Sequence, residues 1–197
     1  SAHSPIAELV TNYPIKSETV ICHIRQANSG DVSLVNTHPF IRPMWGKNWT
    51  YAHNGQLADY KAQLSTKYHL PIGETDSEQA FCWILDQLLK KFDGEEPNTE
   101  VMFHYIISLC QQIHKLGVFN LLLTDGDFLL VYCSNNLHWL TRRAPFGNAS
   151  LIDAEMVVNF DHETTDNDIV TVIATQPLTG DETWQKMYAG EGLLFCK

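Results

Sequence analysis

The sequence predicts an α+β domain in which antiparallel strands pack against a pair of helices. Three observations lead to this class. Apolar, β-branched segments lie near both ends of the chain, two amphipathic helices lie between them, and Asp125-Gly126 marks a tight hairpin. Strands, then two helices, then strands is the order of a layered α+β fold, because a parallel fold would alternate strands with helices.

Two strands are expected before the helices. Residues 18–25 are rich in β-branched and apolar types and follow Pro14, which is typical of a buried strand. Residues 49–53 form the second strand, and Asn54-Gly55 is expected to end it as a turn or strand exit. The segment 26–47 between them is predicted to be a loop.

The helices have clear start and stop signals. Thr75 to Glu78 has the S/T-x-x-E form of a capping box, and apolar residues then recur at spacings of three and four until Gly94. A short polar linker leads to a second helix, whose apolar face runs from Met102 to Leu116 and which Gly117 is expected to close at the C′ position. The helices should form an antiparallel pair on a sheet.

Strands make up the rest of the chain. Residues 118–124 and 128–133 flank the hairpin turn, and 137–141 is expected as the third strand of a meander. A further buried strand is predicted over 169–175 and a last strand over 192–196.

Composition excludes several function classes. The 197 residues fit one domain and carry 13 basic against 23 acidic residues, for a net charge of −10. Nucleic-acid binding depends on clustered cations, so nucleic acid is not expected as a partner. No run approaches the roughly 18 apolar residues of a membrane helix, and the first residues do not form a signal peptide. Five unpaired-looking cysteines without a C-x-x-C motif indicate reduced, buried thiols in a cytoplasmic protein.

Five polar residues at strand and helix ends are candidates for a site. Arg25 offers a planar fork for a carboxylate, Asp76 a counter-charge for an ammonium, and Asn54 with Gly55 two N–H donors that could form an oxyanion hole. Each also has a structural alternative: an ion-pair partner, a helix cap, a turn and, for His38, a packed loop histidine. Together they suit an amino acid with a reactive carbonyl.

Four motifs occur in the order H-x-R-x-A-N (23–28), N-T-H-P-F (36–40), A-H-N-G (52–55) and E-T-D-S-E (74–78). In this order and spacing they resemble the glutaminase domain of class II glutamine amidotransferases. The resemblance implies an N-terminal-nucleophile (Ntn) hydrolase fold, a four-layer αββα sandwich with antiparallel sheets. It covers essentially the whole chain, so residues 1–197 are expected to be a single glutamine amidotransferase type 2 domain. Segments 142–147, 172–180 and 182–185 are similar to the bacterial YafJ-type subgroup.

The resemblance implies a role for each candidate. Arg25 would hold the α-carboxylate of glutamine and Asp76 its α-ammonium. Asn54 and Gly55 would hold the oxyanion formed when the side-chain amide is attacked, and His38 would shape the loop beside the substrate. The reaction releases ammonia through a γ-glutamyl thioester and implies no metal and no organic cofactor. Glutamine and possible ammonia-accepting proteins are the expected partners.

The family's nucleophile is a cysteine at the first position of the mature chain, with its own α-amino group as base. This chain begins with Ser1, so we expect it to be truncated at its N-terminus and to be inactive as it stands. Cys22 lies in a predicted buried strand without a free amine and is expected to be a core residue.

Three alternatives remain open from the sequence. The domain could hydrolyse γ-glutamyl peptides, a reaction related to glutathione breakdown, or it could bind glutamine or γ-glutamyl compounds without catalysis. The third is metal-dependent hydrolysis, suggested by nine histidines, of which His23, His38 and His53 recur at spacings of fifteen. No H-E-x-x-H or similar ligand spacing accompanies them.

Overall fold

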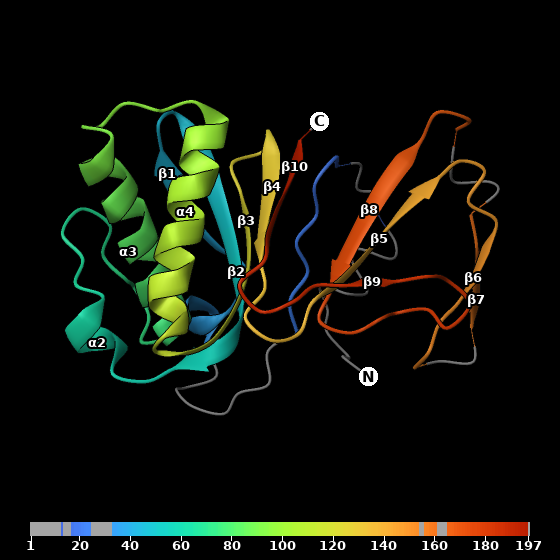
Figure 1. Ribbon diagram of the computed structural model, residues 1–197, viewed down its shortest axis with the longest axis horizontal. Coiled ribbons are helices and arrows are strands. Elements are labelled where there is room, and N and C mark those ends of the chain that lie inside the picture. The colour runs from blue at the N-terminus through green and yellow to red at the C-terminus, as the bar shows by residue number, and fades with distance from the viewer. Residues whose placement is uncertain (1–12, 14–16, 25–32, 154–155, 161–164, 197) are drawn as a thin grey trace.

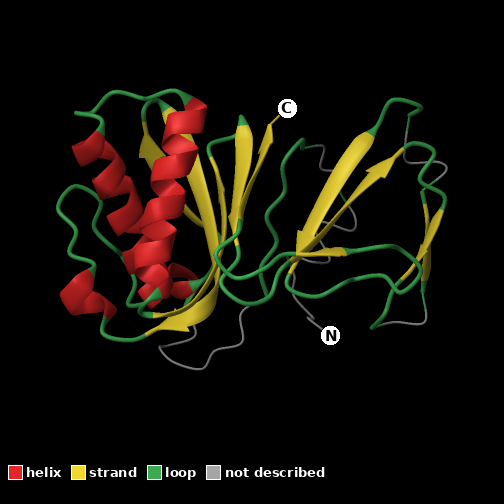
Figure 2. Cartoon of the chain, in the orientation of Figure 1, coloured by secondary structure: helices red, strands yellow, loops and turns green. Residues whose placement is uncertain are grey.

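A computed structural model describes residues 13, 17–24, 33–153, 156–160 and 165–196. A five-stranded antiparallel sheet lies at the centre, with two helices on one face and a second, smaller sheet on the other side (Figures 1 and 2). The mixed α and β architecture with antiparallel sheets confirms the predicted class. In spatial order the central strands are β1 (Phe40–Met44), β2 (Lys47–Leu57), β3 (Gly117–Thr124), β4 (Phe128–Tyr132) and β10 (Gly192–Cys196).

Both long helices form where the sequence predicts them. Helix α3 spans Asp76–Lys91, and the Thr75 hydroxyl accepts a hydrogen bond from the N–H of Glu78, as in a capping box. Helix α4 spans Thr99–His114 and is capped by Asn98, whose side chain accepts from the N–H groups of Glu100 and Val101. Helix α4 ends at His114, and Gly117 is already the first residue of β3. The prediction that Gly117 closes the helix at the C′ position was therefore wrong.

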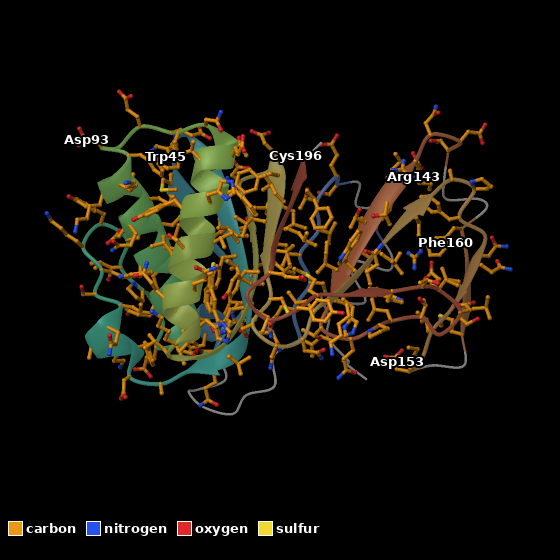
Figure 3. The ribbon with its side chains drawn as sticks, viewed as in Figure 1. Trp45, Asp93, Arg143, Asp153, Phe160 and Cys196 are labelled. Carbon is orange, nitrogen blue, oxygen red and sulfur yellow. The ribbon has the colours of Figure 1, made fainter. Side chains whose placement is uncertain are left out.

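The main core lies between these helices and the central sheet. Because side chains alternate along a strand, one face of β2 sends Trp49 and Tyr51 toward the helices, where both are fully buried. The Tyr51 ring stacks on Phe81 of α3, with centroids 4.8 Å apart and planes 15° apart. At the far end of α3, the indole N–H of Trp45 donates to the carbonyl of Gly94 at 2.7 Å, so the β1–β2 turn lies beside the end of the helix (Figure 3).

The second sheet faces the side of the central sheet that the helices leave open. It consists of β8 (Ile169–Ala174), β5 (His138–Arg143) and β9 (Gln185–Lys186), and a separate two-stranded ribbon joins β6 (Asn148–Ser150) to β7 (Val157–Asn159). A smaller apolar cluster links the two sheets, and in it the rings of Trp139 and Phe195 meet edge to face at 5.9 Å. Two short helical segments, α2 (Tyr60–Gln63) and a 3₁₀ turn (Leu34–Asn36), complete the described chain.

The structure corrects the predictions for residues 18–47. Residues 18–24 form no strand, and Val20 and Ile24 are exposed, because no neighbouring segment pairs with them among the described residues. The predicted loop 26–47 contains β1, an edge strand in which Pro43 is tolerated because an edge leaves one side of the ladder unpaired.

Strand β5 is not the third strand of a meander. It pairs with β8 and β9 in the second sheet, whereas β10 takes the place beside β4. Strand β8 exists as predicted but is only half-buried or exposed along its length, so the prediction of a buried strand was wrong. An apolar β-branched run is typical of a strand, but its burial depends on what packs over it.

Candidate active site

The A-H-N-G motif lies inside a strand and does not end one. Asn54 pairs with Asn120 and Gly55 with Phe119, and β2 continues to Leu57. The prediction of a turn or strand exit was therefore wrong, because the pairing with β3 carries the chain through a dipeptide that usually marks a turn. Both Asn54 and Gly55 are exposed on the described chain.

Gly55 is required by a close approach between strands. A Cβ atom there would lie 1.9 Å from the carbonyl oxygen of Val118 and 2.7 Å from Nε2 of His53. The second contact arises because the imidazole of His53 lies against Gly55 where its Nε2 atom reaches the carbonyl oxygen of Val118. Only glycine leaves room for both contacts.

Asp76 lies at the same end of β2. Its Oδ2 atom accepts a hydrogen bond from the backbone N–H of Leu57 at 2.7 Å, and its Oδ1 atom accepts from the N–H of Ser77 at 2.9 Å. Backbone N–H groups alternate between the two edges of a strand, so the N–H of Gly55 faces the same edge as that of Leu57. A carboxylate and a backbone donor thus meet at one strand edge.

His53 fixes the start of α3 against this strand. It is 2% exposed, and its Nε2 atom lies 3.0 Å from the carbonyl oxygen of Val118, which can only accept. Nε2 therefore carries the proton, and Nδ1 accepts from the hydroxyl of Ser77 at 2.8 Å. Burial lowers the pKa of His53 below its ordinary value of 6.5, so the ring is neutral at pH 7.

A family model described as "Glutamine amidotransferases class-II" matches residues 1–197. The chain is 58% identical over 196 residues to "Putative glutamine amidotransferase YafJ" of Escherichia coli, and the match covers 100% of this chain and 76% of that protein. The chain belongs to the class II glutamine amidotransferases.

Two further relatives agree with this family. A "Putative glutamine amidotransferase" of Haemophilus influenzae is 42% identical over 194 residues, and the match covers 98% of this chain and 65% of that protein. A crystal structure of a predicted glutamine amidotransferase from Pseudomonas aeruginosa has a TM-score of 0.76 at 51% identity, over 88% of this chain and 68% of that one. The fold is thus similar to that of Ntn-type glutamine amidotransferases.

Two of the amidotransferase motifs meet through buried polar groups. Asn36 of N-T-H-P-F is 3% exposed, and its Oδ1 atom accepts from the N–H of Glu74, the first residue of E-T-D-S-E, at 3.0 Å. Glu78, the last residue of that motif, pairs with Arg42 of β1 and accepts from the N–H of Gly73 at 2.7 Å. These bonds hold the segment before α3 against β1.

His38 and Arg25 are the other two predicted site residues. The His38 ring lies 4.2 Å from that of His23 and 4.7 Å from that of Phe40, between centroids, so it packs among aromatic side chains before β1. Arg25 lies outside the described residues. The structure therefore brings together Asn54, Gly55 and Asp76 of the five candidates.

Sequence reasoning missed one polar side chain beside these three. Asn120 of β3 is 3% exposed, and its Nδ2 atom lies 3.1 Å from the carbonyl oxygen and 3.4 Å from Oδ1 of Asn54. A signal was present, because a single asparagine interrupts the otherwise apolar run 118–123. A polar residue inside a buried strand requires partners, and here one of them is Asn54.

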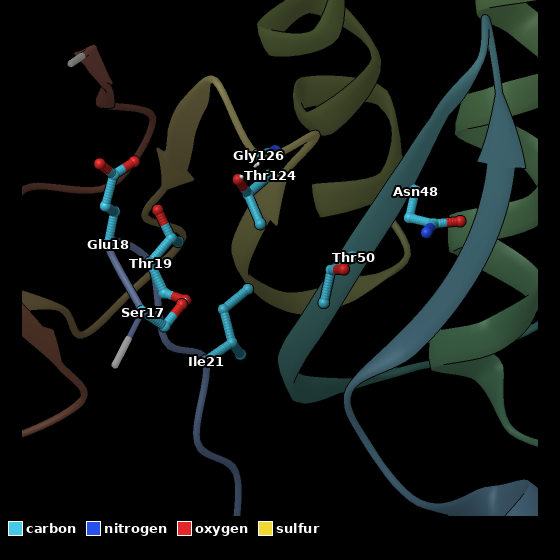
Figure 4. A pocket seen from close by; sticks show the side chains of 8 residues that line it. All are labelled: Ser17, Glu18, Thr19, Ile21, Asn48, Thr50, Thr124 and Gly126. Carbon is cyan, nitrogen blue, oxygen red and sulfur yellow. Dashed lines mark hydrogen bonds between the residues drawn. The ribbon is translucent and has the colours of Figure 1, made fainter. Parts of the chain in front are cut away.

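A cavity of about 250 Å³ lies farther along the same strands (Figure 4). Thr50 pairs with Thr124 at this level, four residues from Asn54 along β2, which corresponds to about 13 Å of extended chain. The cavity is therefore separate from the candidate site at Asn54, Gly55 and Asp76. It is lined by Ser17, Glu18, Thr19 and Ile21 on one side and by Asn48, Thr50, Thr124 and Gly126 on the other.

The histidine and cysteine predictions are also tested. Both ring nitrogens of His53 are bound within the protein, and the described residues hold no group of three metal-ligating side chains. Cys82, Cys110 and Cys133 are buried as predicted, whereas Cys22 and Cys196 are exposed. The prediction that Cys22 is a core residue was wrong because residues 18–24 pair with no strand. Within the described chain, no helix has the length and apolarity to cross a membrane.

Proposed function

We propose that this domain hydrolyses the side-chain amide of glutamine. A cysteine thiolate attacks the carboxamide carbon, the resulting oxyanion collapses, and ammonia leaves with a proton from the nucleophile's α-amino group. Water then cleaves the γ-glutamyl thioester to glutamate. The observation that carries the proposal is the meeting of Asn54, Gly55 and Asp76 at one end of β2, in a chain of this family.

Each group has a role that follows from its chemistry. The side-chain amide of Asn54 and the backbone N–H of Gly55 donate to the oxyanion in both steps. Asp76 attracts the α-ammonium of glutamine, and Arg25 binds the α-carboxylate through its guanidinium. His38 shapes the loop beside the substrate.

None of the three buried cysteines is suited to be the nucleophile. Burial raises the pKa of the Cys82 thiol to about 11, and burial also raises the pKa of Cys110 and of Cys133. These three thiols stay protonated at neutral pH and are poor nucleophiles. We assign the role to a cysteine at the first position of the mature protein, whose own α-amino group acts as the base.

The proposed reaction uses only protein groups, without a metal or organic cofactor. Its ammonia passes either to an acceptor protein or to solvent. Cysteines without disulfide partners favour a reducing compartment, so we place the enzyme in the cytoplasm.

Asp76→Asn provides the sharpest test of substrate binding. The asparagine can still accept the hydrogen bond from Leu57 N–H through its Oδ1 atom, but it lacks the charge that holds an ammonium and the second oxygen that accepts from Ser77 N–H. In full-length protein assayed for ammonia release, we expect KM for glutamine to rise by about 30-fold or more, in line with the loss of a charge pair worth about 2 kcal/mol or more. Asp166→Asn, which removes the charge of an exposed carboxylate before β8, is the matched control and should leave KM unchanged.

The same assay separates the alternatives. Release of ammonia from glutamine at a higher kcat/KM than hydrolysis of γ-glutamyl dipeptides supports the proposal. The reverse order would make the enzyme a γ-glutamyl peptide hydrolase. Binding of glutamine in calorimetry without any turnover by full-length protein would contradict catalysis altogether.

A further inference from the structure

We infer that Asn120 is a positioning residue that aims the side-chain amide of Asn54 into the oxyanion hole. The inference rests on the proposed function, because it concerns how one donor of that site is oriented. It assigns a task to a buried residue that lies 66 positions from Asn54 in the sequence and directly opposite it in the sheet.

An asparagine in an oxyanion hole must present the correct half of its amide. Nδ2 donates to the oxyanion, whereas Oδ1 in the same place would repel it. A rotation of about 180° about the last side-chain bond exchanges the two atoms at almost no steric cost. Asn54 is exposed, so packing alone does not choose between the two orientations.

The orientation of Asn120 is fixed by backbone donors. Its Oδ1 atom accepts from the N–H of Ser134 at 3.0 Å and from the N–H of Asn135 at 3.3 Å. A backbone N–H can only donate, so the oxygen of Asn120 must face these two groups and the NH₂ must face the other way. The side chain is 3% exposed, so water cannot substitute for these partners.

The NH₂ group of Asn120 then dictates the orientation of Asn54. It donates to Oδ1 of Asn135 at 2.7 Å and toward the Asn54 side, where the backbone carbonyl oxygen lies at 3.1 Å and Oδ1 at 3.4 Å. Oδ1 of Asn54 is therefore the atom drawn toward β3. Its Nδ2 atom is left on the opposite side, available to a substrate. We call the four residues Ser134, Asn135, Asn120 and Asn54 the amide relay.

Asn120→Asp replaces the NH₂ group that donates toward Asn54 with an oxygen that can only accept, and the shape of the side chain hardly changes. One carboxylate oxygen can still accept from the backbone N–H groups of Ser134 and Asn135. The other now faces Oδ1 of Asn135 and of Asn54 with a lone pair and a negative charge, which favours turning the NH₂ of both amides toward it. The Asn54 amide is then expected to turn its NH₂ toward residue 120 and its oxygen toward the oxyanion. Losing one such donor lowers kcat by about 100-fold or more, while KM for glutamine changes little.

A double-mutant cycle separates positioning from a general structural role. In an Asn54→Ala background there is no amide to orient, so adding Asn120→Asp should change kcat by less than about twofold. An equal loss of kcat in both backgrounds would overturn the inference. Asn48→Asp controls for the added charge alone: Asn48 is exposed, lies six residues from Asn54 on β2, and its replacement should leave kcat unchanged.

A second measurement does not depend on turnover. The side-chain NH₂ resonances of Asn54, assigned in full-length protein by their loss in Asn54→Ala, should exchange more slowly with water in Asn120→Asp, because the NH₂ now donates to a buried carboxylate. Unchanged exchange would overturn the relay even if kcat falls. Slower exchange in a protein that never hydrolyses glutamine would uphold the relay and refute the proposed function. If Asn120→Asp does not fold, Asn120→Leu enters the same cycle, with a fall in kcat that again must vanish beside Asn54→Ala.

Discussion

Replacement of Gly55 by alanine should separate β2 from β3 at the centre of the candidate site. The new Cβ atom would lie 1.9 Å from the carbonyl oxygen of Val118, about 1.5 Å short of ordinary van der Waals contact at 3.4 Å. Strands of a paired sheet cannot open by this amount and keep their ladder. The hydrogen bond between His53 and Val118 would also be lost, because the methyl group lies 2.7 Å from Nε2.

The expected cost follows from these losses. Two or three hydrogen bonds at about 1 kcal/mol each, with about 1–3 kcal/mol for overpacking, lower the free energy of unfolding by about 3–6 kcal/mol. Urea unfolding followed by tryptophan fluorescence, to which the fully buried Trp49 contributes, measures this cost. Gly46→Ala is the control, because that glycine has a φ of +74° but open space around it, and should cost only about 1–2 kcal/mol. Equal costs for the two variants would refute the argument from close contact.

Three further changes test the scaffold of the site. Burial raises the pKa of Asp86, but hydrogen bonds from three backbone N–H groups outweigh it and lower the pKa below its ordinary value. The stabilisation from Asp86 is therefore present above pH 4 and lost as the pH falls through the lowered pKa. Asp86→Asn should flatten this loss in acid unfolding curves. His53 also has a lowered pKa, so unfolding titrations should show stability falling as the pH drops below 6.5, and His53→Gln should remove that slope. Asn98→Ala removes the cap of α4 and should cost about 1 kcal/mol in urea unfolding, with no change in the slope of the transition.

The helices could be predicted because their signals are local. Thr75 and the apolar spacing after it identify α3 without reference to the rest of the chain, and the structure confirms both its start and its end near Gly94. Strand partners are not local. The order β4, β10 and the assignment of β5 to the second sheet depend on which edges are free after folding, and no short pattern in the sequence records that.

The candidate site also combines residues with local sequence signals and a residue placed only by strand pairing. Asn54, Gly55 and Asp76 stand in motifs that the sequence displays, and the structure brings them to one end of β2. Asn120 belongs to no motif, and its contact with Asn54 exists only because β2 and β3 pair in one particular register. Its polarity within an apolar strand was visible in the sequence, but its partner was not.

Three consecutive residues of β2 act in three directions, and this explains why the site is built on a strand. His53 points to the helices, Asn54 points to the opposite face beside Asn120, and the N–H of Gly55 faces the strand edge near Asp76. A loop could not hold these directions at fixed angles, whereas a paired strand does so through its ladder. Since the donors are set by the sheet, we expect differences in substrate preference within the family to arise in the segments that surround them, such as the one before α3.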